Sequence, residues 1–516
     1  MKLVLLLLLL SIFSTKINAT KLVLIPTANF EETQTLFEDP SIRINFYRDE
    51  FVIASVDAEP KQAFISLDRN PWQENISYYI VYTDEFAEKD EYISLIESRS
   101  DILYHDDFFI FVRTNEKKYG QLPPSKNGMV RIFDQEVKLP SPFLFPSTKS
   151  LTADPFILNL FAEVNGEKIT QRVQHMEDYG TRDAYHPQSV VAQEWIESKF
   201  LDWGLEVEVM DFHMPGGDAS DNVIATLTGT NKPDEFIVLG AHYDSVNWQG
   251  GEEAPGADDN ASGTAGVMEI ARILSQYEFE RSIVFCAFSG EEYGLYGSAA
   301  YASRSASEEM NILGYFNMDM IGYFKPGNTT IMTSLIYPES AKQLADFYTG
   351  ICEVYLPDFV VEPATLTGGD SDHTSFNNNG YMGIFPFEDV ENYSPYIHTA
   401  EDTVGLSYNN EEQAVIFTKA VMASVVTLAN YDDSQSVAEQ AKYTNIYPNP
   451  ASLTVNIIYK NNQPVNLIIS NIAGQNIKET TFNSSKTIDV SAFPKGIYLF
   501  KIESEQFREV HKVIVN

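Results

Sequence analysis

Residues 150–430 carry the pattern that most restricts how this chain can fold. Short, nearly continuous apolar runs recur there at 235–239, 282–288, 312–319 and 382–387. Segments with helical spacing, such as 190–200 and 264–274, lie between the runs. Strands that are apolar all round must be buried on both faces, and the intervening helices supply the cover. We therefore expect an α/β fold with a mostly parallel sheet sandwiched by helices, spanning residues 151–430.

The regions on either side have different patterns and predict further domains. Residues 20–150 contain alternating strand-like runs, which predict a β-rich or α+β domain that could be an accessory domain or a pro-segment. A polar stretch at 431–442 is typical of a linker. Residues 443–516 show short alternating strands separated by turn residues, which predict a small β-sandwich.

Residues 1–19 have the form of a signal peptide. Met1 and Lys2 precede a short apolar run, and polar and small residues then lead to Ala19. A membrane anchor is the alternative, but the run is shorter than the about 20 residues that a span needs. We expect no later transmembrane segment, and we expect the mature chain to be secreted or held at the cell surface.

Charge and cysteine content narrow the possibilities further. Acidic residues outnumber basic ones 73 to 35, for a formal net charge of −38. Phosphate backbones repel such a chain, so we expect no nucleic-acid partner. Only Cys286 and Cys352 are present, so the fold cannot depend on a disulfide framework. One bridge and two buried thiols both fit.

Polar side chains with metal-binding chemistry stand where the apolar runs end. His242 and Asp244 follow the first run, and an extended backbone places both on one side, so that Asp244 can accept the second N–H of the His242 ring. Asp258 and Asp259 lie in a loop of small residues before a helix, and Asp319 follows the third run. Taken alone, each acidic residue could also be a simple helix cap.

Two adjacent glutamates follow the second run. Neighbouring side chains diverge, so one of Glu291 and Glu292 can bind a metal while the other moves a proton. His373 and His398 compete for one further ligand position. Imidazole and carboxylate ligands without thiolate are typical of a catalytic zinc site, although cobalt, manganese or an additional calcium ion would be compatible.

In this order, these segments resemble peptidase family M28, and particularly its bacterial leucyl aminopeptidases. The matching motifs are HYDS at 242–245, PGADDNASG at 255–263, SGEEYGLYGS at 289–298, NMDM at 317–320, SDHTSF at 371–376 and YIHTAEDT at 396–403. The resemblance implies two zinc ions bridged by Asp259, one completed by His242 and Asp319 and the other by Glu292 and His398. It also implies a metal-bridging hydroxide as the nucleophile, Glu291 as the general base, and substrates that are peptides with free N-termini.

The same resemblance makes His373 a pocket or supporting residue. It implies an apolar pocket for the substrate side chain, formed by Met320, Phe385, Phe387, Tyr393 and Ile397. The chain departs from the leucyl-type pattern at 366–370, where LTGGD replaces a cysteine pair and a tyrosine. We hypothesise that Asp370 in this segment favours a basic or polar residue at the substrate N-terminus.

The C-terminal segment resembles the sorting domain of the type IX secretion system of Bacteroidetes. Its motifs are IYPNP at 446–450, IAGQ at 472–475, KGIY at 495–498 and KVIV at 512–515. The resemblance implies the type IX secretion machinery as a partner. An ordinary β-sandwich that binds carbohydrate or protein is the alternative.

Three other functions share the expected catalytic fold. A glutaminyl cyclase uses one metal and does not hydrolyse, a binding protein on an inactive scaffold lacks ligands, and carboxypeptidases or dipeptidases use related sheets with paired zinc ions. The five candidate ligands and both adjacent glutamates are all present, which favours a hydrolase.

Overall fold

The computed structural model describes residues 20–83, 89–217, 220–430, 444–459, 464–471, 476–503 and 508–516. The chain forms two compact units that divide between residues 431 and 432. The predicted signal peptide, the predicted linker and the IAGQ motif lie outside the described residues.

An eight-stranded sheet with the order β15-β14-β16-β13-β11-β12-β10-β9 forms the centre of the first unit. Its four middle strands contain the apolar runs and lie parallel to one another: β11 (Lys232–His242), β12 (Arg281–Phe288), β13 (Asn311–Asn317) and β16 (Gly383–Phe387). The outer strands are β9 (Glu206–Met210), β10 (Asn222–Leu227), β14 (Met332–Ile336) and β15 (Val360–Ala364). Antiparallel pairing begins where β10 meets β12 and where β14 meets β16. The predicted parallel sheet is confirmed in its centre, and its edges are mixed.

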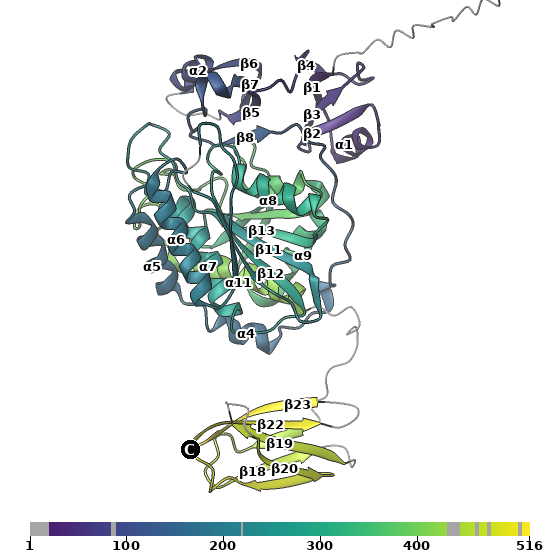
Figure 1. Cartoon of the computed structure of the whole chain (residues 1–516), viewed down its shortest axis with the longest axis vertical. Helices are drawn as coiled ribbons and strands as arrows, with labels where there is room; N and C mark the ends of the chain where they lie inside the picture. The colour runs from purple at the N-terminus through teal and green to yellow at the C-terminus, as the bar shows by residue number, and fades with distance from the viewer. Residues whose placement is uncertain are drawn as a thin grey trace, which may run out of the picture. The chain divides into compact units, whose positions relative to one another are not determined.

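Helices cover both faces of this sheet (Figure 1). Ile237 and Leu239 of β11 belong to the core under one layer, whereas Val238 belongs to the core under the other. The first layer holds α4 (Pro155–Phe161), α5 (Gly166–Glu177), α6 (Pro187–Asp202), the short turn η2 (Ala257–Ser262), α7 (Gly263–Leu274), α9 (Lys342–Tyr355) and α11 (Glu411–Asn430). The second layer holds α8 (Tyr296–Ser307) and α10 (His373–Asn377). The sandwich is therefore as predicted, and the two expected helices correspond to α6 and α7.

Two buried features of this unit bear on the sequence predictions. By length and composition α11 could cross a membrane, but 72% of its apolar window is buried inside the fold, as in the core helix of a soluble domain. Cys286 on β12 and Cys352 on α9 are buried free thiols. Of the two alternatives for the cysteines, the structure therefore has the unpaired one.

The N-terminal region, residues 20–150, contains two antiparallel four-stranded sheets, with the orders β2-β3-β1-β4 and β6-β7-β5-β8. Its elements are β1 (Lys21–Pro26), α1 (Phe30–Phe37), β2 (Ile42–Tyr47), β3 (Phe51–Val56), β4 (Ile65–Asp68), β5 (Ile76–Tyr82), α2 (Lys89–Glu97), β6 (Ser100–His105), β7 (Phe109–Asn115), α3 (Glu116–Tyr119) and β8 (Met129–Ile132). One core joins the two sheets, with Phe46 and Phe111 among its members. Tyr79 and Val81 on β5 belong to another core, shared with Tyr293 of the following region.

The second unit is a β-sandwich, as predicted. One sheet has the order β17-β18-β21 and the other β20-β19-β22-β23. The strands are β17 (Thr444–Tyr447), β18 (Thr454–Tyr459), β19 (Val465–Asn471), β20 (Asn476–Phe482), β21 (Ser485–Asp489), β22 (Gly496–Glu503) and β23 (Arg508–Val515). Val455, Leu467 and Phe500 contribute to one core between the sheets. This unit therefore has a hydrophobic core of its own.

Candidate metal centre

The carboxyl ends of the parallel strands bring the candidate ligands together. His242 is the last residue of β11, while Glu292 and Asp319 follow β12 and β13. Asp259 comes from η2, and His398 from the loop between β16 and α11. Parallel strands end at one edge of a sheet, so residues that are distant in the sequence meet there. All five side chains are buried.

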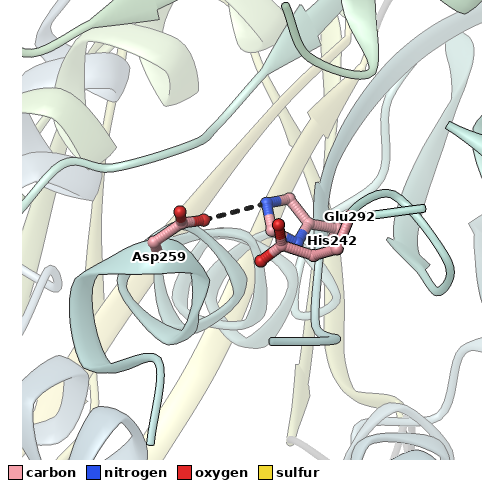
Figure 2. A group of neighbouring side chains, drawn as sticks. All are labelled: His242, Asp259 and Glu292. Carbon is pink, nitrogen blue, oxygen red and sulfur yellow. Dashed lines mark ion pairs between the residues drawn. The ribbon is translucent and has the colours of Figure 1, made fainter. Parts of the chain in front are cut away.

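Asp259 lies between the two histidines and faces one with each carboxylate oxygen. Its Oδ1 is 3.3 Å from His242 Nε2, and its Oδ2 is 2.9 Å from His398 Nε2. His242 Nε2 is also 3.5 Å from Asp319 Oδ1, and His398 Nε2 is 2.8 Å from Glu292 Oε2. Figure 2 shows Asp259, His242 and Glu292 gathered around one space. The contacts thus form two groups that share Asp259.

The donor atoms fit a metal ion. Glu292 Oε1 and Asp319 Oδ1 are buried and have no hydrogen-bond partner among the described residues. A buried carboxylate oxygen without a partner is costly, and coordination to a cation removes that cost. Ligand atoms lie within 4.8 Å of one another in two groups: His242, Asp259 and Glu292, and His242, Glu291 and Asp319. Imidazole and carboxylate without thiolate are the ligands expected of catalytic zinc.

The electrostatics of the centre also favour a cation. Burial alone would lower the pKa of His242 and of His398, but the surrounding carboxylates outweigh it and raise both well above the usual range. Burial raises the pKa of Glu292 to about 7 and that of Glu291 well above its usual value. A buried excess of carboxylates is what divalent cations neutralise in proteins. Protons on the two rings would compensate part of the same charge in the absence of metal.

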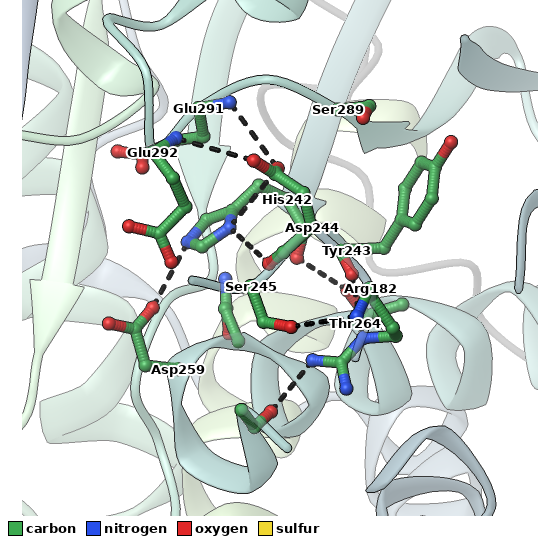
Figure 3. Close-up of polar contacts among 12 residues, drawn as sticks. Arg182, His242, Tyr243, Asp244, Ser245, Asp259, Thr264, Ser289, Glu291 and Glu292 are labelled. Carbon is green, nitrogen blue, oxygen red and sulfur yellow. Dashed lines mark hydrogen bonds and ion pairs between the residues drawn. The ribbon is translucent and has the colours of Figure 1, made fainter. Parts of the chain in front are cut away.

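Asp244 connects the end of β11 to the glutamate loop (Figure 3). Nδ1 of His242 is 3.2 Å from the backbone oxygen of Asp244 and 3.6 Å from its Oδ1. The carboxylate of Asp244 accepts hydrogen bonds from the backbone N–H groups of Glu291 (3.3 Å) and Glu292 (3.4 Å). The His242 ring is thus nearer to the backbone oxygen of Asp244 than to its carboxylate. The carboxylate mainly holds the backbone of Glu291 and Glu292.

Two residues that the sequence analysis did not identify hold the Asp259 loop. Asp402 accepts hydrogen bonds from the N–H of Asp258 (2.9 Å) and of Asp259 (3.0 Å). Arg182 is fully buried and donates to the carbonyl groups of Tyr243 (2.7 Å), Pro255 (2.6 Å) and Gly256 (2.7 Å). Asp402 stands in the YIHTAEDT motif, so that motif could have pointed to it. Arg182 lies outside every motif, and no sequence signal marks it.

The SDHTSF segment supports the centre without joining it. Ser371 donates a 2.7 Å hydrogen bond to Oδ2 of Asp319. His373 packs against Phe385, with ring centroids 5.3 Å apart, whereas Nε2 of His398 contacts the carboxylates of Asp259 and Glu292. Burial lowers the pKa of His373 to about 4, so its ring is neutral at pH 7. The geometry thus favours His398 over His373 as the ligand.

A pocket opens beside the centre. Its apolar wall is made by Met320, Phe385, Phe387, Tyr393 and Ile397. Asp370 also lines it, but its carboxylate already accepts hydrogen bonds from the Tyr82 hydroxyl (3.0 Å), from the N–H of Ser371 (2.9 Å) and from the Thr374 hydroxyl. Asn127 and Gly128 of the N-terminal region also line the pocket. The sequence did not indicate this contribution.

Comparisons with known proteins agree with this arrangement. Residues 222–422 match the model of peptidase family M28, and residues 445–516 match that of a secretion system C-terminal sorting domain. A probable zinc metalloprotease of Pyrenophora tritici-repentis is 30% identical over 338 residues, which cover 54% of this chain and 77% of that protein. A probable leucine aminopeptidase of Trichophyton verrucosum is 29% identical and is covered to 72%, with 50% of this chain aligned.

Other matches differ in extent. A probable zinc metalloprotease of Pyrenophora teres f. teres is 30% identical over 216 residues, but the match spans only 46% of its length and 37% of this chain. The solved structure of the LapA aminopeptidase from Legionella pneumophila superposes with a TM-score of 0.55 at 21% identity. That comparison covers 69% of this chain and 99% of LapA, and it shows a shared fold.

Proposed function

We propose that this chain, which belongs to peptidase family M28, is a secreted di-zinc aminopeptidase that removes the N-terminal residue of peptides. Membership of the family makes it a metallopeptidase, and relatives named leucine aminopeptidases support action at the peptide N-terminus. The observation that carries the two-metal proposal is the position of Asp259, which turns one carboxylate oxygen to His242 and the other to His398.

The donor groups divide naturally between two ions. His242 and Asp319 would hold one, Glu292 and His398 the other, and Asp259 both. Zinc bound in this way would polarise the scissile carbonyl group and lower the pKa of an attacking water molecule. The protein contributes the geometry, because Asp244 and Asp402 fix the backbone on which Asp259 and Glu292 stand.

Glu291 is the residue that we assign to proton transfer. It lines the pocket beside His242, Asp259 and Asp319. The hydrogen bond from its backbone N–H to Asp244 orients it beside the ligands. In the proposed reaction its carboxylate accepts a proton from the attacking water and delivers it to the amine that leaves, which is general acid–base catalysis by one group.

The pocket supports a preference for an apolar N-terminal residue. Met320, Phe385 and Phe387, which line it, belong to one hydrophobic cluster. Asp370 is already engaged by Tyr82 and Thr374, which leaves it poorly placed to bind a substrate cation. A comparison of leucyl and lysyl anilides with wild type and Asp370→Ala tests this, because a lysyl preference lost in the variant would restore the original hypothesis for Asp370.

The C-terminal unit supports export of the enzyme. The unit matches a sorting-domain model and has its own hydrophobic core, as expected of a separately folded domain that secretion machinery recognises. We propose the type IX system as that machinery, and either the medium or the cell surface as the destination.

The decisive experiment measures the release of leucyl anilide together with bound zinc. Glu291→Gln keeps the shape of the side chain but removes the base, so kcat/KM should fall by about 10²–10⁴-fold. Its zinc content should stay at two per chain. Glu292→Gln is the matched control, because the same change one residue later weakens a ligand and should lower the zinc content. Chelation should abolish the wild-type activity, and zinc should restore it.

Three results would contradict the proposal. Metal-loaded wild type that releases nothing from a panel of aminoacyl anilides is not an aminopeptidase. One zinc per chain, with loss of ammonia from a glutaminyl peptide, would identify a cyclase. Full activity in Glu291→Gln would remove that residue from the mechanism.

A further inference from the structure

The N-terminal region reaches the metal centre through the backbone of Ser125. The carbonyl oxygen of Ser125 lies 3.0 Å from Nδ1 of His398. A carbonyl oxygen can only accept, so Nδ1 carries a proton and Nε2 is the nitrogen available to a metal. Nε2 is the atom that faces Asp259 and Glu292. The N-terminal region therefore sets both the tautomer and the orientation that His398 needs as a metal ligand.

The same region braces the loop that carries the two glutamates. The backbone N–H of Arg131 on β8 donates to the carbonyl oxygen of Gly294 (3.2 Å). Gln121 Nε2 donates to the carbonyl oxygen of Tyr293 (3.1 Å). These acceptors directly follow Glu291 and Glu292 in the chain, so Gln121 and β8 of the N-terminal region support the loop.

A third contact holds the side of the pocket that contains Asp370. Arg48 donates to the Tyr82 hydroxyl (3.0 Å) and to the carbonyl oxygen of Leu366 (2.7 Å). The Tyr82 hydroxyl in turn donates to Asp370 (3.0 Å). Both donors come from the N-terminal region, and both acceptors belong to the 366–370 segment that lines the pocket.

We propose that the N-terminal region is a permanent part of the active enzyme, in which the loop 125–128 positions the metal ligand His398 and forms one wall of the substrate pocket. Asn127 and Gly128 supply that wall. A pro-segment that is cut away would leave Nδ1 of His398 without its acceptor and the pocket open on one side. The pocket role and the role of His398 as a metal ligand rest on the proposed function, whereas the contact between Ser125 and His398 does not.

A change of the Ser125 side chain can loosen the loop 125–128 while the carbonyl group that faces His398 stays in the chain. Its hydroxyl is buried, donates to the carbonyl oxygen of Tyr82 (2.9 Å) and accepts from the N–H of Asn127 (3.2 Å). Ser125→Ala removes both restraints but keeps the backbone oxygen. Replacing a group that orients a metal ligand lowers metal affinity by roughly 10–100-fold, and the retained carbonyl group places this variant near the lower end, at about 10-fold.

The first test compares zinc affinities by competition with a chromogenic chelator. In full-length Ser125→Ala one of the two zinc sites should weaken by about 10-fold while the other keeps its affinity. Ser94→Ala is the matched control, because that hydroxyl also donates to a backbone oxygen, that of Asp90 (2.8 Å), on an exposed part of α2. Zinc binding by Ser125→Ala that equals the control would overturn the positioning role.

The second test cuts the chain and needs no change in the site. Leu144, in the segment that leads out of the N-terminal region, is 86% exposed, so a specific protease site can be introduced there. After cleavage the two fragments should co-elute and keep both their zinc and the activity of the uncut chain. Separation of the fragments with a rise in activity would identify a pro-segment and overturn the proposal. Uncut wild type that binds zinc without activity would instead count against the proposed function alone.

Discussion

Asp49, in the turn between β2 and β3, shows how a single half-buried charge affects the stability of the fold. Burial raises its pKa to about 6, and Glu50 and Glu339 add to the rise. An unfolded Asp titrates near about 3.9, so between about pH 4 and 6 the folded state binds more protons than the unfolded state. The Asp49 carboxyl therefore makes the protein less stable as the pH rises through this window.

Asp49→Asn should remove that loss. An Asn oxygen can still accept from the N–H of Glu339, which lies 3.1 Å from the Asp49 carboxylate. We expect the variant to melt above the wild type at pH 7.5 and close to it near pH 4, as measured by calorimetry. Asp107→Asn removes an equal charge from an exposed position, so it should leave the melting temperature unchanged at both pH values. Equal melting of Asp49→Asn and wild type at pH 7.5 would contradict the expectation.

Side-chain chemistry decided which site residues could be read from the sequence. His242 and Asp319 could be identified from the sequence because each follows an apolar run that predicts a buried strand. Ser125 was not, because it acts through a backbone carbonyl group on a histidine 273 residues away. A carbonyl group leaves no mark on a sequence, since every residue has one. Arg182 escaped for a related reason, because all its acceptors are backbone oxygens of other segments.

At the scale of elements, the start of α7 tolerates no side chain. A Cβ on Gly263 would lie 2.0 Å from the carbonyl oxygen of Met318 and 2.4 Å from Asn260 Oδ1. Backbone at the end of β13 cannot yield easily, so Gly263→Ala should push α7 away and displace the adjoining Asp259 loop. We expect a loss of about 1–3 kcal/mol or more in urea unfolding, together with weaker zinc binding.

The control for this change lies in the same helix. Ala265→Gly alters one methyl group in the opposite direction and should lower stability by about 1 kcal/mol or more, through helix propensity and the loss of one buried methyl group. It should leave zinc binding intact. If Gly263→Ala were no worse than Ala265→Gly in both measurements, the close packing of α7 on β13 would not matter as described.

The strands of the sheet differ in how well the sequence predicts them. The middle strands, such as β12 with every residue buried, could be found because they are apolar on both faces. Edge strands such as β9 and β15 are largely exposed, and their mixed composition resembles that of loops. The predicted sheet was therefore right in direction and too small. The antiparallel pairing at its edges could not be read from composition.

At the scale of the whole molecule, the two units should respond differently to loss of metal. Both candidate metal groups lie in the first unit, among the residues that the structure describes. A ligand at 1,000 times its Kd stabilises the state that binds it by about 4 kcal/mol. Chelation should thus lower the melting temperature of the first unit in calorimetry. The melting temperature of the C-terminal sandwich should stay unchanged. Equal shifts in both would show that the units do not unfold independently.

The hydrogen bonds around Arg182 and Asp402 have a consequence for when the enzyme begins to work. They shape the Asp259 loop by contacts within the protein alone. In the proposed secreted enzyme, a loop held in this way would keep its form without metal, and folding and zinc binding would then be separable steps. Zinc supply at the destination would then decide when activity starts, and the producing cell would be spared a working peptidase during transit.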